Sequence, residues 1–431
     1  MGQVTCDDFY TGHRAALAGG TTYHIDFALP VGGDLLKGYQ AWREKATPNA
    51  VMDYSFHMAV TSWNDKISEQ MGLLTQRHGI NSFKFFMAYK GALMVNDEQL
   101  LAGFQRCKEI EAIAQVHAEN GDAVALGQEK VFVEMGVTGP EGHALSRPAG
   151  LEGEATARAA RLAEFVNTPL YVVHVMSGDA AEEVVRARSR GARIIGETVA
   201  SALALDESRM WDKNFTVAAQ YVMSPPIRSK QHGAAVRAAL AGGQLQVVGT
   251  DHAVFNSSQK SVGKHDFRII PNGVNGIEER MHIVWDEMVN TGLLSASDFV
   301  RVTSTAAAQI FNVYPQKGVI APGSDADIIV FDPRVEHVIG AATHHSAMDT
   351  NVYEGRRVRG KVVTTISRGR VVWHDGVLDV ERGSGRYVRL RTGGAWFEGV
   401  GEREKRVRTF GGVYGPVPVE RKGDVVGKDE L

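Results

Sequence analysis

The sequence is poor in cysteine, in net charge and in long apolar runs. Among its 431 residues the only cysteines are Cys6 and Cys107, which excludes a disulfide framework. The formal net charge is −3, from 47 basic and 50 acidic residues, so nothing favours nucleic acid or an anionic membrane as a partner. No apolar run reaches the roughly 18 residues of a membrane-spanning helix. These absences leave a globular protein with one large domain and a smaller one.

The two ends of the chain give conflicting signals about its compartment. The first residues have neither the basic nor the apolar region of a signal peptide, which predicts a soluble, cytoplasmic protein. The last four, Lys-Asp-Glu-Leu at 428–431, match an address for retention in the endoplasmic reticulum. That address is read only in a chain that has entered this compartment. It therefore predicts a lumenal protein if a signal peptide precedes this sequence, and is fortuitous otherwise.

Short apolar stretches alternate with amphipathic ones over roughly the first 250 residues. The apolar stretches begin near residues 21, 53, 81, 113, 169, 192 and 244. Repeated units of this kind predict parallel strands joined by helices. Seven strands are one fewer than a closed (β/α)8 barrel requires. We therefore expect an α/β barrel of this type that lacks its first strand.

Beyond residue 312 the composition changes. Stretches rich in valine, isoleucine and threonine, such as 361–373, predict a small β-subdomain over residues 313–382. From residue 383 onward glycine, arginine and lysine dominate, which predicts a tail over 383–431 that is weakly ordered or lies on a partner. The barrel would then occupy residues 1–312.

Four strand-like stretches carry a side chain suited to metal chemistry near one end. Lys84 interrupts the apolar stretch 81–89, and His117, His174 and Asp251 follow in later stretches. In a barrel of parallel strands such positions meet at the carboxyl ends of the strands. Each residue alone has a plainer explanation: a core histidine, a helix-capping aspartate or a lysine held by a salt bridge. Together they favour one site built from four strands.

The chemistry of these side chains suits Zn²⁺ or a similar divalent ion, because histidine nitrogen and aspartate oxygen are common ligands. A lysine ammonium has no free lone pair, but burial lowers the pKa of a lysine. A neutral amine at Lys84 could combine with CO₂ to give a carbamate, which could bridge two metal ions that share a nucleophilic hydroxide. Asp251 could take the proton of that hydroxide and pass it to a leaving nitrogen.

The sequence resembles the dihydropyrimidinases, a branch of the cyclic amidohydrolase (hydantoinase) family, over nearly its whole length. The resemblance is carried by five long stretches: NSFKFFMAYK (81–90), AQVHAENGD (114–122), LYVVHVMS (170–177), PNGVNG (271–276) and GSDADI (323–328). It implies a (β/α)8 barrel with two Zn²⁺ ions per subunit. A carboxylated Lys84 would bridge these ions, and His117, His174 and Asp251 would be further ligands.

The resemblance also implies a substrate and a set of residues around it. The hydroxyl group of Tyr89 would stabilise the developing oxyanion, and Ser224 and Asn272 would bind the substrate, largely through backbone atoms. The implied reaction is the hydrolytic ring opening of 5,6-dihydrouracil or dihydrothymine to an N-carbamoyl-β-amino acid, a step of pyrimidine catabolism. Members of the family are typically homotetramers.

One motif of the family is missing. The first barrel strand of these enzymes ends in a His-x-His pair, and this sequence contains no such pair. We therefore expect the sequence to start after that strand, to bind at most about one metal ion well, through Lys84, His117 and His174, and to have little or no hydrolase activity. Two alternatives stay open: a non-catalytic scaffold similar to the collapsin-response-mediator proteins, and a hydantoinase or allantoinase. The retained ligands and Tyr89 favour an enzyme over the scaffold.

Overall fold

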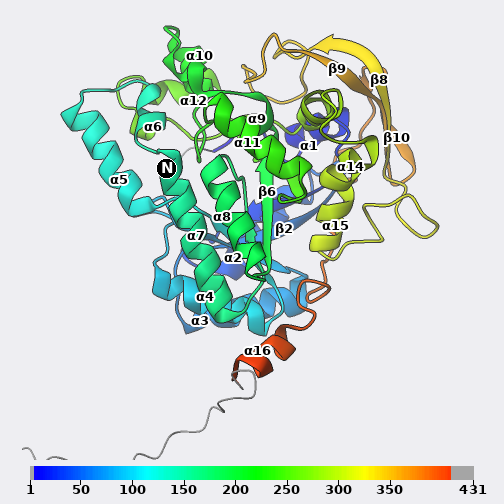
Figure 1. The fold of residues 1–431 in the computed structure, drawn as a ribbon. Helices are drawn as coiled ribbons and strands as arrows, with labels where there is room; N and C mark the ends of the chain where they lie inside the picture. The colour runs from blue at the N-terminus through cyan, green and yellow to red at the C-terminus, as the bar shows by residue number, and fades with distance from the viewer. Residues whose placement is uncertain (1–3, 409–431) are drawn as a thin grey trace, which may run out of the picture.

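The computed structural model describes residues 4–408, and its larger part is a parallel sheet surrounded by helices (Figure 1). The sheet has seven strands in the order β1 to β7, each parallel to the next. The strands are β1 (Tyr23–Ala28), β2 (Asp53–Val60), β3 (Ser82–Phe86), β4 (Ile113–His117), β5 (Leu170–Val172), β6 (Ile194–Val199) and β7 (Val247–Gly249). The prediction of seven parallel strands is confirmed.

Helices follow most of these strands and cover the outside of the sheet. The longer ones are α1 (Thr11–Ala18), α2 (Leu35–Ala46), α3 (Asp65–Leu73), α4 (Asp97–Glu109), α5 (Gly121–Glu129), α7 (Ala149–Val166), α8 (Gly178–Ser189) and α11 (Lys230–Ala241). Helix α4 shows why they form. Asn96 and Gln99 make a reciprocal capping box at its start, and Leu100, Phe104 and Cys107 are buried at helical spacing.

Shorter helices lie in the connections and after β7. They are α6 (Glu141–Leu145), α9 (Ala200–Ala204), α10 (Phe215–Gln220), α12 (Ser257–Lys260), α13 (Arg280–Val284), α14 (Ala296–Val300) and α15 (Ala306–Ile310). Within the described residues the sheet is open between β7 and β1. Arg280 spans this opening: its guanidinium donates to the carbonyl oxygen of Val248 at 3.1 Å and to the hydroxyl oxygen of Thr21 at 3.1 Å.

The smaller part is an antiparallel sheet, which confirms the predicted β-subdomain and lies at the upper right of Figure 1. Its strands are β8 (Ile328–Val338), β9 (Arg357–Ser367), β10 (Arg370–His374) and β11 (Val377–Leu378), in the order β11-β10-β9-β8. Lys317 ties this part to the barrel, because its ammonium donates to Asp53 at the start of β2 at 2.8 Å and to Asp327 at 2.6 Å.

The segment that follows the small sheet is ordered, so the prediction of a weakly ordered chain is wrong for residues 383–408. It runs across the amino ends of the barrel strands: the Tyr54 N–H donates to the Arg386 carbonyl at 2.9 Å, and the Leu390 N–H to the Gly79 carbonyl at 3.0 Å. Helix α16 (Val400–Arg408) follows. Residues 409–431, including the terminal tetrapeptide, lie outside the described residues.

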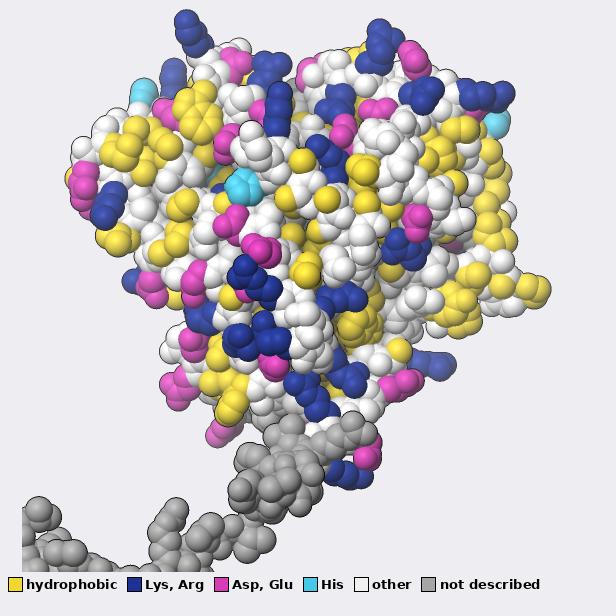
Figure 2. Space-filling model, in the orientation of Figure 1, with side chains coloured by type: hydrophobic (Ala, Val, Ile, Leu, Met, Phe, Trp, Pro, Cys, Tyr) yellow, Lys and Arg dark blue, Asp and Glu magenta, His cyan; other side chains and the backbone are white. Residues whose placement is uncertain are grey.

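The surface carries charges of both signs. On the face seen in Figure 2, basic and acidic side chains are intermixed, as in the ion pair between Arg186 and Glu182 at 2.8 Å on α8. No helix among the described residues is long and apolar enough to cross a bilayer.

Candidate metal and substrate site

The predicted metal-site residues lie at or just beyond the carboxyl ends of their strands. Lys84 is in β3, His117 ends β4, His174 follows β5 and Asp251 follows β7. Lys84, His117 and His174 are all buried. His174 and Asp251 have positive φ angles of 39° and 47°, a conformation that non-glycine residues rarely adopt and that recurs at functional sites.

The two histidines face each other. The Nδ1 atom of His117 and the Nε2 atom of His174 are 2.9 Å apart. The other ring nitrogen of His117, Nε2, is 2.8 Å from Glu119 Oε2, and the Arg147 guanidinium donates to the same oxygen at 2.8 Å. Burial alone would raise the pKa of Glu119, but Arg147 and His117 outweigh it and lower this pKa. Glu119 is therefore a carboxylate, and it accepts a hydrogen bond from the Nε2–H group of His117. The Nδ1 atom of His117 is then unprotonated and faces Nε2 of His174.

Lys84 lies among aromatic rings, with its ammonium 4.2 Å from the ring centre of Phe27 and 5.0 Å from that of Phe86. Burial lowers the pKa of Lys84 to about 8, although the charges of Asp251 and Glu197 oppose this. Burial also raises the pKa of Asp251, against the charge of Lys84. A fraction of Lys84 is therefore a neutral amine near neutral pH, the form that can react with CO₂.

The described residues bring together part of a metal-binding donor set. In the described part of the chain, no three His, Cys, Asp or Glu side chains are arranged to hold a metal ion. The two facing histidines supply two nitrogens, and a carbamate on Lys84 would supply oxygen. The Nδ1 atom of His174 is buried without a hydrogen-bond partner, which shows that the polar groups of this site are not all satisfied by the chain itself.

Tyr89 lies beside the histidines, with a positive φ angle of 66° and its ring centre 5.1 Å from that of His117. Burial raises the pKa of Tyr89 to about 12, with Arg147 and the nearby Ser224 side chain opposing. The phenol is therefore protonated at neutral pH and can donate a hydrogen bond. The hydroxyl group of Ser224 is also 3.4 Å from Nε2 of His143.

Asn272 lies in a segment next to that of Ser224. The N–H group of Gly273 donates to the carbonyl of Val222 at 3.0 Å. Gly273 has a φ angle of 152°, and a Cβ atom there would lie 1.9 Å from the carbonyl oxygen of Ala253, so only glycine fits. The structure thus brings Lys84, His117, His174, Tyr89 and Ser224 into one region with Asp251, and places the segment of Asn272 at its border.

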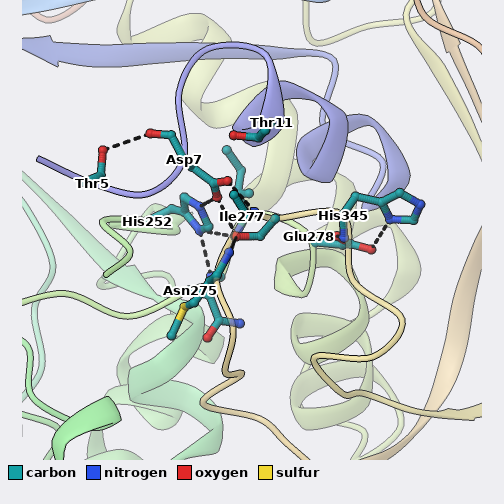
Figure 3. Close-up of polar contacts among 12 residues, drawn as sticks. Thr5, Asp7, Thr11, His252, Asn275, Ile277, Glu278 and His345 are labelled. Carbon is teal, nitrogen blue, oxygen red and sulfur yellow. Dashed lines mark hydrogen bonds and ion pairs between the residues drawn. The ribbon is translucent and has the colours of Figure 1, made fainter. Parts of the chain in front are cut away.

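His252, the residue after Asp251, lies between Asp7 and the backbone near Asn275 and Ile277 (Figure 3). Its Nε2 atom is 2.8 Å from Asp7 Oδ2, and its Nδ1 atom accepts from the backbone N–H of Gly276 at 3.2 Å and of Ile277 at 3.4 Å. Because backbone N–H groups can only donate, Nδ1 is the unprotonated nitrogen and Nε2–H donates to Asp7. His252 therefore has a structural role: it joins Asp7 to the backbone of Gly276 and Ile277.

Two acidic residues of the site were missed by the sequence analysis. Glu119, described above, is two residues after His117. Glu197 in β6 accepts from the hydroxyl group of Tyr171 at 2.7 Å and from the backbone N–H of His174 at 3.1 Å. Both could have been found with the argument used for Lys84, because each is an ionisable residue in or next to an apolar strand.

Comparisons with known proteins agree with this geometry. A model of the amidohydrolase family matches residues 7–372. The dihydropyrimidinase of Arabidopsis thaliana is 56% identical over 420 residues, which are 95% of this chain and 79% of that protein. The solved dihydropyrimidinase of Brevibacillus agri NCHU1002 has a TM-score of 0.89 and 44% identity, over 91% of this chain and 85% of that one. The D-hydantoinase of a Bacillus sp. AR9 also has a TM-score of 0.89 and 44% identity, over 91% and 86%.

Proposed function

Because this chain belongs to the amidohydrolase family, and within it to the group of dihydropyrimidinases and hydantoinases, we propose that it hydrolyses cyclic amides of the 5,6-dihydropyrimidine class. Water is added across the ring amide of 5,6-dihydrouracil or dihydrothymine, the C–N bond breaks, and an N-carbamoyl-β-amino acid leaves. The observation that carries this proposal is the facing pair His117 and His174 beside Lys84 and Tyr89, on a chain 56% identical to the Arabidopsis thaliana dihydropyrimidinase.

The metal ion would be held by His117, His174 and an oxygen of carboxylated Lys84, and Zn²⁺ suits this nitrogen-rich set. A bound divalent cation supplies Lewis-acid activation of water and of the amide carbonyl. A second ion would need ligands that the described residues do not offer. We propose one ion per chain, with Glu119 fixing the tautomer of His117 and Arg147 fixing Glu119.

The remaining residues would handle the substrate and the protons. Asp251, a carboxyl group whose pKa is raised by burial, would accept a proton from the attacking water and deliver it to the ring nitrogen as the C–N bond breaks. The Tyr89 hydroxyl group would donate a hydrogen bond to the carbonyl oxygen as negative charge develops on it. Ser224 and Asn272 would bind the ring through backbone atoms. We also propose a homotetramer, which multi-angle light scattering would measure.

The experiment compares 5,6-dihydrouracil, hydantoin and allantoin as substrates of the zinc-loaded chain, with product detected chromatographically at high protein concentration. We expect slow turnover that is fastest with dihydrouracil, and its loss in Lys84→Ala and His174→Ala. Inductively coupled plasma mass spectrometry should find about one Zn²⁺ per chain. Two tightly bound ions with rapid turnover would contradict the one-ion site.

A second candidate function is that of a hydantoinase, since the chain is as similar to the Bacillus sp. AR9 D-hydantoinase as to the Brevibacillus agri dihydropyrimidinase, with a TM-score of 0.89 and 44% identity in both comparisons. Faster hydrolysis of hydantoin than of dihydrouracil would select it. No hydrolysis of any of the three compounds by the zinc-loaded chain would instead favour a non-catalytic scaffold.

A further inference from the structure

A second buried lysine lies outside the metal site. Lys260, the last residue of α12, is 2% exposed. Its ammonium donates to three backbone carbonyls: Ala219 at 3.1 Å, Val222 at 2.9 Å and Gly273 at 2.8 Å. An ammonium group has three N–H donors and no acceptor, so every donor of Lys260 is used.

No carboxylate among residues 4–408 pairs with this buried charge. Burial lowers the pKa of Lys260, but three carbonyl acceptors around Nζ require the ammonium form, because a neutral amine would turn its lone pair toward one of them. Buried lysines are normally paired, as Lys317 is with Asp53 and Asp327. An apolar side chain would fill the position of Lys260 without the cost of burying an ammonium, so the three carbonyls that it binds explain its presence.

These carbonyls belong to the two segments that carry the candidate substrate-binding residues Ser224 and Asn272. Ala219 and Val222 lie in the Ser224 segment (residues 219–224), and Gly273 lies in the Asn272 segment (residues 271–275). One direct hydrogen bond also joins them, from the Gly273 N–H to the Val222 carbonyl at 3.0 Å. The Val222 carbonyl therefore accepts hydrogen bonds from both the Lys260 ammonium and the Gly273 N–H. Lys260, Val222 and Gly273 form one junction between the two segments.

The backbone that carries Lys260 is itself held in place. At the start of α12 the Asn256 N–H donates to the side-chain oxygen of Gln259 at 2.9 Å, and the Asn256 side chain accepts from the backbone N–H of Asp349 at 3.1 Å. The Asn272 segment is also joined to the strand-end residues, because the Ala253 N–H donates to the Val274 carbonyl at 3.3 Å. Ala253 lies two residues after the candidate proton carrier Asp251, so the Asn272 segment is bonded close to that residue.

We propose that Lys260 is a positioning residue of the substrate pocket, which holds the Ser224 segment and the Asn272 segment at the spacing at which both contact the cyclic amide. The identity of the pocket rests on the proposed function, whereas the junction itself does not. Removal of the ammonium would leave three buried carbonyls with fewer donors and would let the segments separate.

The test replaces Lys260 by methionine in the full zinc-loaded chain, with Lys317→Met as the matched buried-lysine control. Contacts made through the two segments are present before and during the reaction, so their loss should raise KM more than it lowers kcat. For Lys260→Met we expect KM for dihydrouracil to rise by about tenfold or more, with zinc content unchanged. Lys317→Met should lower stability and leave KM unchanged.

A second measurement is independent of the substrate. Hydrogen–deuterium exchange followed by mass spectrometry on the ligand-free chain should show faster exchange in residues 219–224 and 271–275 of Lys260→Met. Lys317→Met should not show this pattern. If Lys260→Met does not fold, Lys260→Gln takes its place, because an amide keeps two N–H donors and should give a smaller change in the same direction.

The outcomes separate this proposal from the proposed function. Unchanged exchange in both segments, or equal acceleration in Lys260→Met and Lys317→Met, overturns the role of Lys260. Faster exchange with unchanged KM also overturns it, since Lys260 would then be purely structural. If the wild-type chain hydrolyses only hydantoin, the proposed substrate fails, and the same comparison of KM is made with hydantoin.

Discussion

The buried ionisable side chains of the site differ in how their charge is compensated. Glu119 is held by His117 and Arg147 at 2.8 Å each. Lys84 lies against the rings of Phe27 and Phe86, with its ammonium 4.2 and 5.0 Å from the ring centres. Attraction to aromatic faces is weaker than an ion pair with a carboxylate in a buried site. Lys84 therefore destabilises the metal-free protein, and carboxylation followed by metal binding would remove that cost.

We predict that Lys84→Met stabilises the metal-free chain while it abolishes zinc binding. Burial lowers the pKa of Lys84 from 10.5 to about 8, which corresponds to roughly 3 kcal/mol. The unfolded chain keeps the proton up to about pH 10 and the native chain loses it above about pH 8, so the stability of the wild type rises with pH in this window. Urea unfolding in a chelating buffer should therefore show an advantage of the variant at neutral pH that shrinks at high pH.

Lys317→Met is the control for this prediction, because this substitution should lower the stability of the chain. Burial would lower the pKa of Lys317, but Asp327 and Asp53 outweigh it and raise this pKa. Removal of the lysine leaves these carboxylates buried without a partner, which costs about 3–5 kcal/mol. A loss of stability in both variants would contradict the view that Lys84 is uncompensated in the metal-free chain.

At the scale of single elements, local sequence patterns predicted the strands and the unusual lysine of the site. The apolar stretches gave all seven barrel strands, and the lysine inside 81–89 led to Lys84. The path of residues 383–400 was not predictable, because it is fixed by backbone bonds to Tyr54 and Gly79, which are more than 300 residues away in the chain. Glycine- and arginine-rich composition says nothing about such partners.

The packing of α4 against β3 gives a prediction for zinc binding. A Cβ atom at Gly103 in α4 would lie 2.3 Å from the ring of Phe85, the neighbour of Lys84 in β3. Gly103→Ala should therefore displace β3, lower the free energy of unfolding by about 1–3 kcal/mol and weaken zinc binding. Competition with a chromophoric chelator measures the affinity, and thermal unfolding measures the stability.

Gly150→Ala is the matched helical control. Gly150 lies in the first turn of α7, and a Cβ atom there meets nothing within 4 Å. We expect this variant to keep its zinc affinity and to gain up to about 1 kcal/mol of stability, because alanine reduces the entropy of the unfolded chain. Equal zinc affinity in both variants would show that β3 tolerates the displacement without effect on Lys84.

For the whole molecule, contacts between distant segments hold the open barrel together. Asp7 meets His252 and Ser346, which are 245 and 339 residues away in the sequence, and the Ser346 hydroxyl donates to Asp7 at 2.6 Å. Arg280 joins the two edges of the sheet. This junction could not be predicted from the sequence, because no local pattern relates residue 7 to residues 252 and 346.

The junction at Asp7 should be a source of acid sensitivity. Burial would raise the pKa of Asp7, but hydrogen bonds from His252, from Ser346 and from the backbone of Ala347 outweigh it and lower the pKa to about 2. A carboxyl group with a depressed pKa contributes stability above its unfolded pKa, and that contribution is lost as the pH falls through its folded pKa. The relevant window is therefore from about pH 4 down to about pH 2.

Asp7→Asn should lower the free energy of unfolding by about 2 kcal/mol at neutral pH, and the difference from the wild type should vanish as the pH falls through that window. Urea unfolding at a series of pH values measures both effects. Asp122→Asn is the control, because Asp122 is 65% exposed in its pair with Lys90 and should change stability by less than about 1 kcal/mol. If the stability curves of Asp7→Asn and the wild type stay parallel down to the acid limit, the carboxylate of Asp7 contributes no charge-dependent stability. The barrel opening would then be held by Arg280 and by packing alone.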